Sequence, residues 1–209
     1  MNTENNNQSN PIEAAGFLHE ALRTAANQVK QISDQLGTVH SLQGLTLAFT
    51  NWVTVLIFNM TQQENHVEPS LRDALSKATS NEDQKNGSII LALSRVGRQE
   101  QMQTIEDVFS VLYGEIGDTS LITRTTQHLQ RQILAMEMAQ TNNLETQDLL
   151  MIPILANRMD RFDQLSLIKN LLIDEQSDNR RWIVEWISEN SNPISKSALA
   201  EIESQLADI

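Results

Sequence analysis

Residues 59–69 read NMTQQENHVEP and residues 143–155 read NLETQDLLMIPIL, and these two stretches decide how the chain is expected to fold. Each stretch places an Asn and a Gln four residues apart, Asn59 with Gln63 and Asn143 with Gln147, and each has a proline six residues after the Gln. A spacing of four puts both amides of a pair on one face of a helix. Since the neighbouring residues at helical spacing are apolar, we expect that face to point into the protein core.

The composition favours helices throughout the chain. Aromatic residues make up only 4% of the 209 residues, and there are only 7 Gly and 4 Pro, whereas β-sandwiches need many turn residues. Residues 79–87 (TSNEDQKNG) are polar and rich in turn formers, so they are predicted to be an internal linker. Apolar periodicity predicts helices over residues 11–36, 40–63 with a continuation after Pro69, 88–116, 120–159 with a bend near Pro153, 164–173, 180–189 and 195–206.

Two long helical pairs joined by a polar linker predict an all-α fold, an up-down-up-down four-helix bundle with short additional C-terminal helices. Residues 1–10 are expected to be a disordered lead, 11–176 the bundle, and 177–209 C-terminal helices packed on it. Trp182, Ile183 and Trp186 form an apolar patch that docks onto the bundle or serves a partner or homodimer contact. The two halves repeat the same order of features, so a site between them would lie in the interior.

Charge and hydropathy exclude several partners. The net charge of -12 argues against a nucleic-acid backbone or an anionic membrane surface. The longest apolar run, Trp52 to Phe58, is far too short to span a bilayer, and the polar N-terminus MNTENNNQSN is not a signal peptide. The absence of cysteine fits a reducing compartment. We therefore expect a soluble, cytoplasmic protein with no membrane or nucleic-acid partner.

The motifs resemble those of the hemerythrin-like family. FLHEALR at 17–23 looks like its first-helix motif, RQEQMQTIEDVF at 98–109 like its third, and the two opening stretches like its second and fourth. The tail at 180–206 is also similar to the terminal helices of some bacterial members. The family pattern has a His on the first and third helices and His-x-x-x-Glu on the second and fourth. Of these ligand positions this chain keeps only one, His19, and the others are Asn59, Gln63, Gln101, Asn143 and Gln147.

These replacements argue against the iron chemistry that the resemblance implies. A di-iron pair needs carboxylates for charge and imidazoles for strong nitrogen donors. Amide oxygens are neutral and bind transition metals weakly, so a single His19 does not hold iron. We expect a protein with no metal and no cofactor. Its former metal cavity would be lined by His19, Asn59, Gln63, Gln101, Asn143 and Gln147.

Two interpretations of these side chains stay open. An unpaired buried amide costs about 1–3 kcal/mol, so the six either bond one another and trapped water, or they bind a ligand. On the network interpretation, replacing Asn59 and Asn143 together should cost less than the two single changes summed.

The corresponding functions are a binding or sensory module for a small molecule or protein, and a metal-independent enzyme that orients a reactive substrate in a specialised biosynthetic pathway. His19 is the only catalytic candidate, because histidine exchanges protons near neutral pH.

A weaker candidate for a site lies between Gln63 and Pro69. His66 with Glu64 and Glu68 has the residue types of a divalent-ion site. Their spacing places them on different faces of a helix, so a solvated turn is the preferred interpretation.

Overall fold

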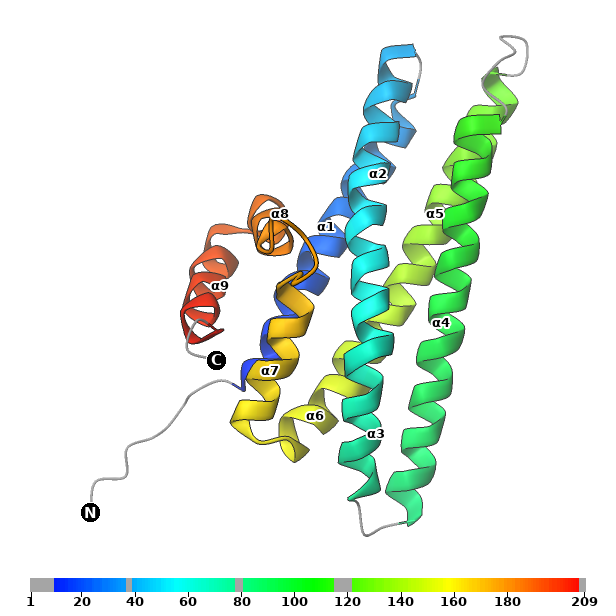
Figure 1. Cartoon of the computed structure of the whole chain (residues 1–209). Coiled ribbons are helices and arrows are strands. Elements are labelled where there is room, and N and C mark those ends of the chain that lie inside the picture. Colours follow the sequence, from blue (N-terminus) through cyan, green and yellow to red (C-terminus); the bar gives the residue numbers. More distant parts are fainter. Residues whose placement is uncertain (1–9, 37–38, 78–80, 115–121, 207–209) are drawn as a thin grey trace.

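The computed structural model describes residues 10–36, 39–77, 81–114 and 122–206, which form helices and short turns with no strand among them (Figure 1). The predicted all-α class is confirmed. The short elements before and within the long helices are η1 (Pro11–Ala14), η2 (Gln63–Val67) and η4 (Gln147–Met151). The α-helices are α1 (Ala15–Asp34), α2 (Val39–Gln62), α3 (Glu68–Ser76), α4 (Asn81–Gly114), α5 (Ile122–Thr146), α6 (Ile152–Arg158), α7 (Arg161–Leu172), α8 (Trp182–Asn190) and α9 (Pro193–Leu206).

The first helix follows from its apolar periodicity. Pro11 begins the 3₁₀ turn η1, where its missing N–H costs no hydrogen bond, and α1 continues from it. Leu18, Leu22 and Val29 are buried on one face of α1. That face contacts α2 and α5, so α1 is held on two sides.

The other long helices enclose the same core. In Figure 1, α2, η2 and α3 form one continuous rod, with α4 beside it. The α4 helix packs mainly on α5 and also contacts α2 and α3. Phe49 on α2 makes edge-to-face contacts with Trp52, at 5.9 Å between ring centroids, and with Phe109 on α4, at 5.2 Å. These rings fill the core on one side of the amide positions.

The linker predicted over residues 79–87 is wrong for most of its length. The α4 helix already begins at Asn81 and continues through Gly87, while residues 78–80 lie outside the described residues. A Cβ at Gly87 would lie only 2.2 Å from Cδ1 of Leu75 on α3. A side chain at Gly87 would therefore displace the Leu75 side chain, and Gly87 lies within a helix and not in a turn.

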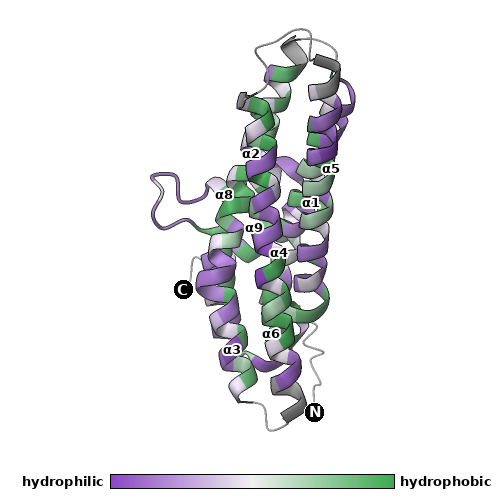
Figure 2. Ribbon diagram, turned by 90° about the vertical axis from the view of Figure 1, so that its right-hand side faces the viewer, coloured by the Kyte–Doolittle hydropathy of each residue, from purple (hydrophilic) through white to green (hydrophobic). Residues whose placement is uncertain are grey.

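The C-terminal helices pack beside the first long helix. The carboxylate of Asp160 accepts a hydrogen bond from the backbone N–H of Asp163 and caps α7. The α8 helix contacts α1, and α9 contacts α7 and α8. Ile183 is buried, and the Trp182 ring lies edge-to-face against Phe58 on α2. Figure 2 shows that α8 is largely hydrophobic and that the turn leading to it is hydrophilic.

Some predicted features lie outside the described residues. They are the disordered lead up to residue 9, the predicted linker's first residues and the predicted start of the fourth long helix near residue 120. The described part of that helix begins at Ile122.

One helical run extends well beyond the apolar stretch Trp52 to Phe58 that the sequence shows. Within the described ranges, Leu42–Ser76 meets the length and composition of a membrane-crossing helix, with a mean hydropathy of 1.2 over its most apolar window. Of that window, 44% is buried inside the protein. The core helix of a soluble protein meets the same two criteria, so this finding is weak support for a membrane span.

Candidate functional site

The six predicted site residues are all buried, and they lie on four long helices if η2 and η4 are counted with the helices α2 and α5 that they continue. His19 is on α1, Asn59 is on α2, and Gln101 is on α4. Asn143 is on α5, while Gln63 and Gln147 begin the elements η2 and η4. Asn59 exposes 1% of its surface and Gln101 none. The sequence therefore predicted correctly which side of each helix faces inward.

Both Gln residues begin a π-helical turn, and the two turns are built in the same way. The backbone N–H of Glu68 donates to the carbonyl of Gln63, and the N–H of Ile152 donates to the carbonyl of Gln147. A proline follows immediately in each case, at Pro69 or at position 153. Proline lacks an N–H and clashes with the carbonyl four residues earlier, and a widened turn accommodates both defects. Single π turns of this kind occur frequently at functional sites.

The amides form two separate pairs and not one network. Nε2 of Gln63 donates to Oε1 of Gln147 over 2.5 Å, which joins η2 to η4. Nδ2 of Asn143 donates to Oε1 of Gln101 over 2.9 Å, which joins α5 to α4. The hydrogen-bonded partner of Asn143 is therefore Gln101 and not Asn59. No hydrogen bond between Asn143 and Asn59 supports the expected non-additive cost of replacing both.

Several amide atoms in this region have no hydrogen-bond partner among the described residues. Both side-chain atoms of Asn59 are in this state, together with Oε1 of Gln63 and Nε2 of Gln147. The second pair also leaves one atom unpaired on each side chain, Nε2 of Gln101 and Oδ1 of Asn143. A buried polar atom without a partner costs about 1–3 kcal/mol, so these atoms call for an explanation.

A small cavity lies beside the first pair. His19, Asn59, Gln63 and Gln147 line it, together with apolar residues that include Met151 and Ile12. The space open to the centre of a water-sized molecule is about 10 Å³, which is roughly what a single water needs. Gln101 and Asn143 lie outside this lining, so the cavity contains four of the six predicted residues. Three of the residues that line it, Asn59, Gln63 and Gln147, together carry two donor atoms and two acceptor atoms without a partner.

His19 is held by a carboxylate that the sequence did not reveal. Nδ1 of His19 lies 2.5 Å from Oδ1 of Asp148, and the guanidinium of Arg23 lies 2.6 Å from the other carboxylate oxygen. Burial alone would raise the pKa of Asp148, but the hydrogen bonds and charges of His19 and Arg23 outweigh it and lower that pKa. Asp148 therefore stays ionised and fixes the orientation of the His19 ring.

The sequence also did not predict a second set of buried hydrogen bonds, which Gln140 makes. Nε1 of Trp52 donates to Oε1 of Gln140 over 2.6 Å, and Nε2 of Gln140 donates to the carbonyl of Leu22 over 3.1 Å. Gln140 is fully buried and joins α1, α2 and α5. Gln140 lies three residues before Asn143 and seven before Gln147, so helical spacing is consistent with its burial on the same face, but its partners on other helices do not follow from the sequence.

The preferred interpretation of the residues around Glu68 was wrong. Glu68 is 2% exposed, and its carboxylate accepts hydrogen bonds from Arg98 at 2.5 Å and Ser94 at 3.2 Å on α4. Arg95 adds a longer contact of 3.4 Å. Glu68 is therefore half of a buried ion pair and does not belong to a solvated turn, although Glu64 is exposed.

The donor set does not fit a di-iron centre. Five of the six predicted site residues carry neutral amides, which supply no charge to offset a metal. Within the described residues, no group of three or more His, Cys, Asp and Glu side chains is placed to hold a metal ion. The arrangement suits hydrogen bonding to a neutral guest better than it suits metal ligation.

Comparison with known proteins gave no match to a family model, a curated protein or a solved structure.

Proposed function

We propose that this chain is a metal-free, hemerythrin-like four-helix bundle that acts as a binding module for a small polar molecule. The contacts among α1, α2, α4 and α5 support the bundle, as does Figure 1, where successive long helices run in opposite directions. The repeated amide, π turn and proline support an origin in a two-fold metal site. The Nδ1 contact of His19 with a carboxylate is also the one that metal-binding histidines usually make.

The observation that carries the binding function is the set of unpaired amide atoms at the cavity. Asn59 offers an adjacent donor and acceptor there, and Gln63 and Gln147 add one acceptor and one donor. A core that only needed stability would have apolar side chains at these positions, because they pack without leaving polar atoms unpaired. The amides are accounted for if they bind a guest.

The chemistry of the lining defines the guest. Donors and acceptors occur in equal number, so the guest must both donate and accept hydrogen bonds. The amides carry no charge to compensate an ion, and an uncompensated buried ion is strongly disfavoured. The guest is therefore a small neutral molecule. One larger than water requires Gln63 and Gln147 to separate, which frees two further amide atoms for it.

Titration with formamide, the smallest neutral amide, tests this function. Formamide has three non-hydrogen atoms, and a ceiling of about 1.5 kcal/mol per atom limits its dissociation constant to roughly 0.5 mM or weaker. We expect saturable shifts of the side-chain amide NMR signals of Asn59, Gln63 and Gln147 between about 1 and 50 mM. N,N-dimethylformamide, which has no donor, should give no such shifts, and neither should formamide with the Asn59→Leu variant. Equal responses to both compounds, or none to formamide, would contradict the proposal.

A second function, metal-independent catalysis, is favoured by one observation. His19 lines the cavity while Asp148 holds its Nδ1 and Arg23 holds Asp148. A histidine base oriented by a third group is the usual arrangement in proton-transfer enzymes. The substitution His19→Gln separates the two functions. A binding module keeps its response to formamide in this variant, whereas an enzyme loses turnover of its substrate.

A further inference from the structure

A second and larger cavity lies on the outer side of η2. It has a volume of about 390 Å³, which suits a small-molecule ligand, and it lies between η2 with α3 on one side and α6 with α7 on the other. Gln63 at the start of η2 faces the buried amide cavity, while Asn65 and His66 in the same turn line this outer cleft. The two cavities share a wall but differ in size and accessibility.

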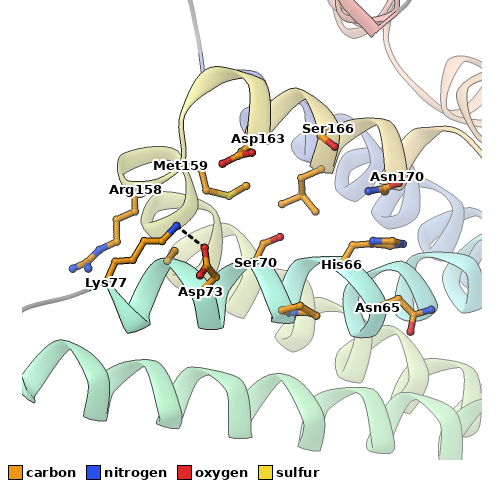
Figure 3. A pocket seen from close by; sticks show the side chains of 13 residues that line it. Asn65, His66, Ser70, Asp73, Lys77, Arg158, Met159, Asp163, Ser166 and Asn170 are labelled. Atoms are coloured by element: carbon orange, nitrogen blue, oxygen red, sulfur yellow. Dashed lines mark hydrogen bonds and ion pairs between the residues drawn. The ribbon is translucent and has the colours of Figure 1, made fainter. Parts of the chain in front are cut away.

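Two rows of polar side chains face each other across the cleft. Figure 3 shows one row on η2 and α3 and the other on α7, with Met159 at one end of the second row. Both rows repeat at helical intervals of 4, 3 and 4 residues: His66, Ser70, Asp73 and Lys77 in the first, and Met159, Asp163, Ser166 and Asn170 in the second. Facing stripes at these intervals are normally apolar and close onto each other. Here seven of the eight side chains are polar, Met159 being the exception, and the rows enclose a cleft that Pro69, Ala74 and Leu167 also line.

One end of the cleft attracts ammonium groups. Nζ of Lys77 lies 2.6 Å from the carboxylate of Asp73, and the lysine side chain is 69% exposed. The hydrogen bond and charge of Asp73 raise the pKa of Lys77, and the charges of Asp163 and Asp160 raise it further against slight burial. Asp73 contacts the Lys77 ammonium directly, and Asp163 lines the cleft in the facing row. Arg158 also lines the cleft, but its guanidinium points away from the two rows in Figure 3.

We propose that the cleft binds a small organic amine, whose ammonium group takes the position that Lys77 occupies beside Asp73, with Asp163 in the facing row of the cleft. The Lys77 ammonium shows which group fits there, and its exposed side chain is free to leave when a ligand amine arrives. Ser70 and Ser166 line the middle of the cleft, and His66 and Asn170 face each other at its far end. These groups bind a second polar group of the ligand. The negative net charge of the protein favours the approach of such a cation.

Calorimetric titration with 1,4-diaminobutane tests the proposal, with 1,4-butanediol as the uncharged analogue. We expect the diamine to bind and the diol not to bind. Asp163→Asn should weaken diamine binding about two- to fivefold, the range for one exposed ion pair. Lys77→Met should strengthen it by a similar factor, because the competing ammonium is gone. Asp178→Asn, an exposed change in the turn before α8, is the matched control and should have no effect.

Three results would overturn the proposal. One is equal binding of the diol and the diamine, which would show that charge does not select the ligand. Another is an equal loss of affinity in Asp163→Asn and Asp178→Asn, which would reduce the effect to general attraction by an acidic protein. The third is unchanged or weaker binding in Lys77→Met, which would place the amine elsewhere. None of these results depends on the buried amide cavity, so the proposed function is tested separately.

Discussion

The hydrogen bond between Asn143 and Gln101 allows a quantitative test of the buried amides. Gln101 is fully buried, and its Oε1 accepts from Nδ2 of Asn143. Gly97 on α4 packs against the same side chain, since a Cβ there would lie 3.1 Å from Oδ1 of Asn143. Asn143 therefore has little room to turn towards another partner, and removing Gln101 should leave its donor unpaired.

The two single changes should each destabilise the fold, and the double change should cost less than their sum. Gln101→Met and Asn143→Leu nearly preserve volume, and each breaks the hydrogen bond between the two side chains. Each single change unpairs one buried partner atom but also removes one atom that was already unpaired, so it should cost about 0.5–1.5 kcal/mol, the net worth of a hydrogen bond. The double variant removes both partners and their two unpaired atoms, Nε2 of Gln101 and Oδ1 of Asn143. The cost of the double variant should therefore be about 0.5–3 kcal/mol smaller than the sum of the single costs.

Urea unfolding followed by circular dichroism measures these free energies. Asn142→Leu, an exposed neighbour on α5, is the control and should change stability by less than about 0.5 kcal/mol. Asn59→Leu combined with Asn143→Leu should be additive, because the two side chains are not bonded to each other. Additive costs for the Gln101 and Asn143 changes, or costs as small as the control, would refute the buried pairing.

Three further predictions follow from other parts of the core. Elemental analysis of the purified protein should find no stoichiometric iron, manganese or zinc. Two metals per chain would contradict the conclusion that these side chains do not fit a di-iron centre. Glu68→Gln should destabilise the protein by about 3–5 kcal/mol in urea, because it removes the charge that balances Arg98, whereas the exposed Glu64→Gln should have little effect. The lowered pKa of Asp148 means that its stabilising contribution is complete above the carboxyl's usual value and is lost as the pH falls through its folded value. The melting temperature should therefore fall below about pH 4, and it should fall less steeply in the Asp148→Asn variant. An equal dependence of the melting temperature on pH in the two proteins would count against the ion pair.

The sequence was sufficient to predict the inward faces of the helices. Apolar residues at helical spacing identify a buried stripe, and Asn59, Gln101 and Asn143 lie on it as expected. Hydrogen-bond partners could not be obtained in this way, because they depend on how far each helix slides and rotates against its neighbours. The pairing of Gln63 with Gln147, and not with a third amide, is set by that packing.

Two errors had a definite physical origin. Asp148 was missed because it follows Gln147 directly, and in a regular helix adjacent residues point in different directions. The π turn η4 begins at Gln147, and both residues have buried partners there, Gln63 for the amide and His19 for the carboxylate. The linker was misplaced because residues 79–87 are polar and rich in turn formers, whereas helix α4 already includes Asn81 to Gly87. The sequence holds one weak signal for the position of Asp148, which is the proline that follows the π turn at position 153.

A high-resolution crystal structure tests the central claim most directly, through the electron density in the cavity between His19, Asn59, Gln63 and Gln147. We expect a neutral guest, at least one water molecule, within hydrogen-bonding distance of both amide atoms of Asn59. Crystals soaked in formamide should show that molecule at the same position. An empty cavity, with both Asn59 atoms bonded to other protein groups, would contradict a receptor role and leave a closed structural core.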